Sequence, residues 1–100
     1  MVELLKDKDK VVRSDAAQAL GEMGPPAAAA VPALIALLAD DGRLVRLNAA
    51  WALGKIGREA RGAVAALRKT LHAPEGDVQF AAHEALKKID PDAATQARVP

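Results

Sequence analysis

The sequence predicts an all-α fold, a right-handed solenoid of stacked antiparallel helix pairs. One pattern occurs three times along the 100 residues at a spacing of 33. Within each copy the hydrophobic residues recur at helical spacing, and glycine or proline stands where helices would end or begin. A fixed period of this length is typical of repeats that bury their apolar faces against their neighbours.

The repeated pattern starts at Val12, Val45 and Val78. Val-Arg-x-x-Ala-Ala-x-Ala-Leu-Gly-x-Met-Gly at 12–24 returns at 45–57 with isoleucine in place of methionine. In the copy at 78–90, Gln79 replaces the arginine, and a lysine and an aspartate replace the two glycines. The third copy is therefore an eroded version of the other two.

Each unit contains two predicted helices. In the middle unit the first helix carries an apolar side formed by Val45, Ala49, Ala52, Leu53 and Ile56. Asp41-Gly42 offers an N-cap region before it, and Gly57 offers a C′ position after it. A second helix is indicated by the stripe Val64, Leu67, Arg68 and Leu71, whose counterpart is Val31, Leu34, Ile35 and Leu38.

Proline and glycine mark particular places in these helices. Pro32 falls in the first turn of a second helix, and Pro25-Pro26-Ala27 predicts a short helical turn before it. Gly21 and Gly54 lie inside first helices, where each costs about 1 kcal/mol relative to alanine. We interpret both as packing glycines that let another backbone come close.

We expect one domain, residues 1–100, forming part of a longer array. Residues 1–7 match the end of a second helix, 8–40 and 41–73 are full repeats, and 74–100 is an incomplete repeat. Residues 93–100 resemble 29–32, where the next second helix should begin. The alternative takes the polar Lys87, Lys88 and Asp90 as a terminal cap.

Composition excludes several classes of function. The chain has no cysteine, which removes disulfides, thiol catalysis and cysteine metal sites. It has no apolar run of 18 residues and no basic-then-apolar leader, so we expect a cytoplasmic protein without a membrane span. The net charge is +1, yet residues 41–73 carry seven basic and two acidic residues. The middle unit is thus a basic band.

The pattern at 12–24 and 45–57, followed by Ala-Val-Pro-Ala-Leu-Ile-Ala-Leu-Leu at 30–38, resembles the HEAT repeat in its short, phycobilisome-lyase-like variety. The resemblance implies a curved stack with first helices on the convex side and second helices on the concave side. It also implies that the protein holds other proteins. Arg13 and Arg46 resemble the family's structural arginine, which bridges neighbouring repeats; Gln79 breaks that series.

The first candidate contact surface is apolar. Leu44, Leu47 and Trp51 share a helical side roughly opposite the core stripe, and Phe80 occupies the position of Leu47 one repeat later. Aromatic residues on exposed apolar patches often anchor partners. The alternative for Trp51 is a structural one, in which its ring lies sideways across the small Ala17 or His83 face of a neighbouring repeat.

The second candidate surface is basic and contains Arg58, Arg61 and Lys69. Arg58 and Arg61 cluster at the turn between helices, and Lys69 stands among alanines on the expected concave face. One lysine among alanines, without interleaved aromatic residues, makes a poor phosphate track. A solvated edge or an acidic protein partner fits better than nucleic acid.

The sequence predicts no catalytic, cofactor-binding or metal-binding residues. His83-Glu84 invites comparison with deoxyhypusine hydroxylase, a HEAT-like iron enzyme. In that family the His-Glu pair directly follows the Val-Arg step, and here it lies three residues later. One histidine with one carboxylate is also too few for a closed site.

We therefore predict a non-catalytic scaffold or adaptor for protein–protein interaction, with self-association through open solenoid ends as a further expectation. One alternative is a regulatory or bilin-lyase-type subunit of a larger enzyme system. A second is nucleic-acid binding through the basic middle repeat.

Overall fold

The computed structural model describes residues 2–92, and every element in this part of the chain is a helix. In chain order, with η for 3₁₀-helices, they are η1 (Val2–Lys6), α1 (Lys10–Met23), η2 (Pro25–Ala30), α2 (Val31–Leu37), α3 (Arg43–Ile56), η3 (Gly57–Ala63), α4 (Val64–Thr70) and α5 (Gly76–Ile89). The expected likeness of 93–100 to 29–32 lies outside the described residues.

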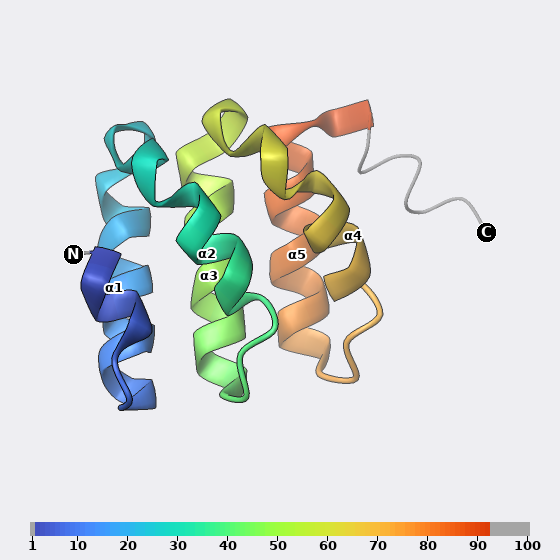
Figure 1. Cartoon of the computed structure of the whole chain (residues 1–100). Coiled ribbons are helices and arrows are strands. Elements are labelled where there is room, and N and C mark those ends of the chain that lie inside the picture. The colour runs from blue at the N-terminus through green and yellow to red at the C-terminus, as the bar shows by residue number, and fades with distance from the viewer. Residues whose placement is uncertain (1, 93–100) are drawn as a thin grey trace.

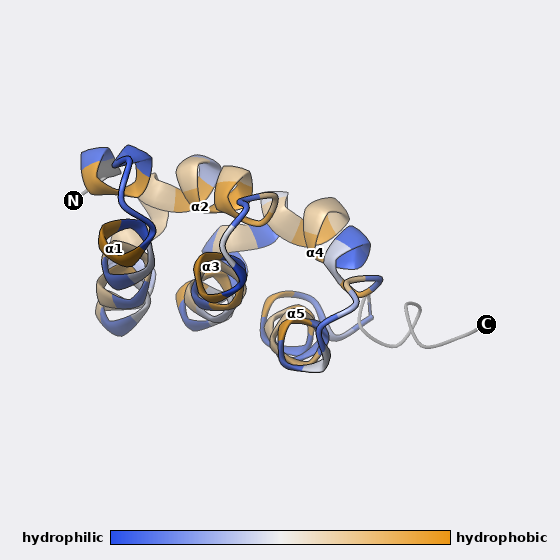
Figure 2. Ribbon diagram, turned by 90° about the horizontal axis from the view of Figure 1, so that it is seen from below, coloured by the Kyte–Doolittle hydropathy of each residue, from blue (hydrophilic) through white to orange (hydrophobic). Residues whose placement is uncertain are grey.

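The helices form two layers. The first-helix layer contains α1, α3 and α5 side by side, and the second-helix layer contains η1, α2 and α4 (Figures 1 and 2). Neighbours within the first-helix layer make the most extensive contacts, while α2 packs on α3 and α4 packs on α5. This arrangement confirms the α-solenoid of stacked antiparallel helix pairs.

Local sequence determines where these helices begin and end. The Asp9 carboxylate accepts the Val11 N–H at 2.8 Å and caps α1. At the start of α3 the cap residue is Gly42, and the carboxylate at this turn comes from Asp40 rather than Asp41. Gly24 and Gly57 end α1 and α3 with φ of 69° and 78°, a backbone region that favours glycine.

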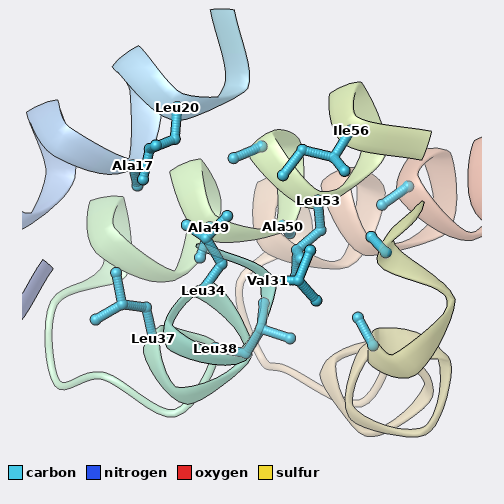
Figure 3. Packing of buried hydrophobic residues seen from close by; sticks show 14 of the residues in the cluster. Ala17, Leu20, Val31, Leu34, Leu37, Leu38, Ala49, Ala50, Leu53 and Ile56 are labelled. Carbon is cyan, nitrogen blue, oxygen red and sulfur yellow. The ribbon is translucent and has the colours of Figure 1, made fainter. Parts of the chain in front are cut away.

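The core between the layers consists of alanine and larger aliphatic side chains. Ala17, Leu34, Ala49 and Leu53 are fully buried, and Figure 3 shows how they meet between the layers. Small residues at the contacts allow the helices to approach closely. Val45 and Val78 are also buried, whereas the equivalent Val12 is half-buried.

The interior glycines lie where the first helices are closest. A Cβ atom at Gly21 would lie 2.9 Å from Ala52 Cα, and one at Gly54 would lie 2.9 Å from Ala85 Cα. Ala85 follows Ala52 by 33 residues, so the same close approach recurs at both helix pairs. These contacts fit the packing role predicted for Gly21 and Gly54.

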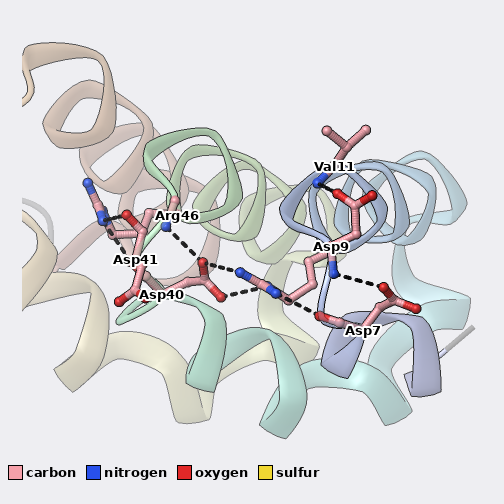
Figure 4. A network of polar contacts seen from close by, with 8 residues as sticks. Asp7, Asp9, Val11, Asp40, Asp41 and Arg46 are labelled. Atoms are coloured by element: carbon pink, nitrogen blue, oxygen red, sulfur yellow. Dashed lines mark hydrogen bonds and ion pairs between the residues drawn. The ribbon is translucent and has the colours of Figure 1, made fainter.

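A series of arginines joins the loops along one edge of the stack (Figure 4). Arg13 donates to the Asp7 carbonyl at 2.6 Å and pairs with Asp40, its Nε lying 2.8 Å from Oδ2. Arg46 donates to the Asp40 carbonyl at 2.6 Å and to Glu75 Oε2 at 2.9 Å. Both arginines therefore bridge neighbouring repeats, as the family resemblance implies.

Asp40 lies at the centre of this network, and its environment changes its acidity. Burial pulls the pKa of Asp40 upward, but the hydrogen bonds from Arg13 and the Gly42 amide, with the charges of Arg13 and Arg46, outweigh it. The pKa of Asp40 is therefore held below its ordinary value of 3.8. The folded structure therefore stabilises the ionised form of the Asp40 carboxylate.

Candidate protein-binding groove

A groove of about 520 Å³ runs between α3 and α5 in the first-helix layer. We call it the α3–α5 groove. Its lining comes from α1, α3 and α5: Gln18, Leu47, Asn48, Trp51, Gly54, Asp77, Phe80, Ala81, Glu84, Ala85 and Lys88. Most of the lining surface is apolar, as is usual for binding sites.

Small residues form the floor of the groove and large ones form its walls. Gly54 and Ala85 touch at the bottom, where a Cβ on Gly54 would lie 3.2 Å from the Ala85 Cβ. Leu47 and Trp51 rise from α3 on one side. On the other side Phe80 rises from α5 with 66% of its surface exposed. The groove thus presents an exposed aromatic ring beside a half-buried one.

Trp51 has a structural contact as well as a place in the groove wall. Its ring lies against Gly21 of α1, with Cε3 only 2.7 Å from where a Cβ on that glycine would be. The ring therefore covers the gap where α1 and α3 approach each other. The structural interpretation predicted that the ring lies across the Ala17 or His83 face of a neighbouring repeat; the ring does lie across a neighbouring repeat, but on Gly21. The same side chain also lines the groove.

The open groove reflects a difference between repeats. Thirty-three residues after Trp51 the chain carries Glu84, which lines the groove with Gly54; the nearest atoms to a Cβ on Gly54 belong to Ala85 and not to Glu84. Glu84 is half-exposed and pairs with Lys87 at 3.2 Å. Because position 84 carries glutamate where position 51 carries tryptophan, no ring from this position covers Gly54 as the Trp51 ring covers Gly21.

Charges along the groove are distributed unevenly. At the amino-terminal ends of the two helices, Asp77 pairs with Arg43 at 3.2 Å. At the carboxyl-terminal ends stand Lys55 and Lys88, which occupy equivalent repeat positions. The Nζ of Lys55 lies 5.9 Å from the Trp51 ring centroid. Among residues 2–92, neither lysine has a carboxylate partner.

The structure brings together some of the predicted site residues and separates others. Leu47, Trp51 and Phe80 share the groove, whereas Leu44 is exposed one helical turn before Leu47 and is not part of the lining. Arg58 and Arg61 are exposed on η3. Lys69 lines a second groove of about 400 Å³ between α2 and α4, formed with residues such as Ile35, Ala66 and His72.

Several lining residues were not predicted from the sequence. Gly54, Ala81 and Ala85 form the floor, and Asp77, Glu84 and Lys88 lie along the rim. One feature of the sequence could have indicated the groove: position 84, which is equivalent to position 51 in the next repeat, carries glutamate instead of tryptophan. Asn48 was missed too; its amide donates to the Ser14 hydroxyl at 2.7 Å and joins α3 to α1.

No three His, Cys, Asp or Glu side chains in 2–92 gather as metal ligands would. Over the same range, each helix falls short of the length and apolar character needed to cross a bilayer.

The fold and the periodic contacts define a class, the helical repeat solenoids. The sequence model of HEAT repeats matches residues 1–87, and the chain belongs to this family. HEAT repeats generally mediate protein–protein interaction. No curated protein matches the chain.

Among solved structures, the chain is similar to a crystal structure of an engineered protein from the Northeast Structural Genomics Consortium, with a TM-score of 0.80 and 31% sequence identity. The match covers 96% of this chain and 47% of that one. This chain therefore spans about half the length of that protein.

Proposed function

We propose that the chain is a non-catalytic scaffold that binds a protein partner in the α3–α5 groove. The observation that carries the proposal is the meeting of Leu47, Trp51 and Phe80 around one apolar groove. Aromatic residues in such positions are enriched among the residues that dominate binding energy. The membership in a family that generally binds proteins supports the same function.

The polar groups of the groove favour binding over catalysis. Asp77 and Lys88 are exposed, and Glu84 is half-exposed. A catalytic pocket usually holds convergent polar groups shielded from water, and these side chains stand at the rim. The separation of Lys69 from Arg58 and Arg61 likewise favours a protein partner over nucleic acid, whose binding needs a continuous cationic track. Self-association through the ends of the stack stays a prediction.

A photo-crosslinking experiment tests the proposal. The crosslinker p-benzoylphenylalanine is placed at Phe80, or as a control at Val11, in cells that naturally make the chain. Val11 is a fair control because it is 65% exposed, against 66% for Phe80, and lies outside the groove. A discrete crosslinked protein at position 80 and none at position 11 is the expected result. Equal products at both positions, or no product at position 80, would contradict groove binding.

A further inference from the structure

We infer that the α3–α5 groove takes an acidic amphipathic helix of a partner protein, an inference that rests on the proposed function.

The walls determine the backbone conformation of the occupant. Both α3 and α5 satisfy their backbone N–H and C=O groups internally, so the groove offers no free backbone edge to an extended segment. A buried occupant must therefore form its own backbone hydrogen bonds, which a helix does. Laying the apolar face of a helix into such a groove is a recurring mode of recognition.

The charges beside the groove determine which sign of charge the occupant should carry. The carboxylates of the groove are matched, Asp77 by Arg43 and Glu84 by Lys87. The unmatched charges are Lys88, which lines the groove, and Lys55, which lies outside the lining with its Nζ 5.9 Å from the centroid of the Trp51 ring. Neither lysine has a carboxylate partner in the described part of the chain. A complementary occupant carries Asp or Glu at the end that lies over these two lysines.

A selection from a displayed library tests the inference without assuming a partner. Random helical peptides without tryptophan are selected against the whole chain. Each selected peptide is then titrated while the emission of Trp51 is followed. Trp51 is the sole tryptophan of the chain, so its emission reports occupation of the groove. Dependence on the groove is checked with Phe80→Ala, which should weaken binding at least tenfold.

The expected peptides carry large apolar residues at i, i+3 or i+4 and i+7, and an excess of Asp and Glu. Reversing both charges with Lys55→Glu and Lys88→Glu should weaken the binding of these peptides about tenfold, because attraction between the lysines and the acidic residues becomes repulsion. The matched control reverses Lys6 and Lys8, two exposed lysines near η1, and should leave affinity unchanged. An equal loss with the control pair would make the effect one of net charge and overturn the inference.

Other outcomes separate this inference from the proposed function. Groove-dependent peptides without an acidic excess would overturn the inference and leave the proposed function standing. A selection in which every binder ignores Phe80→Ala would overturn both. Trp51 emission that shifts with protein concentration in the absence of peptide would make a second copy of the chain the occupant, and this too would overturn the inference.

Discussion

The ring of Trp51 lies directly on Gly21, and the two residues determine how α1 and α3 meet. A Cβ at Gly21 would come within 2.7 Å of the ring carbon Cε3 and within 2.9 Å of the Ala52 Cα. Neither separation is possible without movement, so this helix position can hold only a hydrogen atom as its side chain.

Gly21→Ala should destabilise the protein although alanine favours a helix by about 1 kcal/mol. Overpacking against a backbone atom and a ring costs about 1–3 kcal/mol, and the propensity gain offsets only part of it. We expect a net loss in the free energy of unfolding, measured by urea denaturation. The control is Gly76→Ala, at an α5 position with no atom within 4 Å of the added Cβ, which should be neutral or stabilising. Equal effects at both glycines would contradict the packing role.

Trp51→Ala and Phe80→Ala should separate stability from binding. Removing the Trp51 ring uncovers the α1–α3 contact and should cost about 2–4 kcal/mol. Phe80 is mostly exposed, so its removal should change the free energy of unfolding by less than about 0.5 kcal/mol. Thermal melting of both variants gives the comparison. A Phe80→Ala variant that loses as much stability as Trp51→Ala would show that Phe80 belongs to the core.

Stability should fall in acid through Asp40. Its pKa is lower in the folded chain than in the unfolded one, so the folded state binds fewer protons and gains stability as pH rises. The contribution is fully present above pH about 4, near the unfolded pKa, and is lost as pH falls through the folded pKa. Asp40→Asn should cost about 1–3 kcal/mol at pH 7 and reduce the loss of stability below pH about 4.

The matched control for this prediction is Asp15→Asn. Asp15 is an exposed residue of α1, and asparagine there should leave stability at pH 7 unchanged. Urea denaturation of the parent chain and of both variants at pH 7 and pH 3 provides the six values needed. If Asp40→Asn lost as much stability between these two pH values as the parent chain does, the Asp40 account would be wrong.

The 33-residue period was sufficient to predict the fold, because each unit repeats the same contacts with its neighbours. The period also placed Gly21 and Gly54 at equivalent close approaches. It could not predict that the carboxylate partner of the arginine moves from Asp40 to Glu75, because Glu75 aligns with Gly42 and not with Asp40. That change depends on side-chain reach, which spacing does not contain.

The candidate site was predicted in part. Leu47 and Trp51 were predicted to share one helix face, and the 33-residue period placed Phe80 at the position of Leu47 in the next repeat. The structure places all three residues around the groove. Leu44 shares the face but lies a turn away from the lining. The openness of the groove depends on the direction in which Trp51 points, toward α1 and onto Gly21. A list of residues on one helix face does not give that direction.

Glu84→Trp tests the central claim most directly. Position 84 repeats position 51, so a ring there should cover Gly54 as Trp51 covers Gly21 and close the α3–α5 groove without removing any existing apolar contact. The measurement is the yield of the position-80 photo-crosslink, with Glu84→Gln as the control that removes the charge and keeps the groove open. We predict a folded Glu84→Trp variant with an undiminished melting temperature and no crosslinked partner, beside a Glu84→Gln variant that retains it. An unchanged crosslink yield in a folded Glu84→Trp variant would contradict binding in the groove.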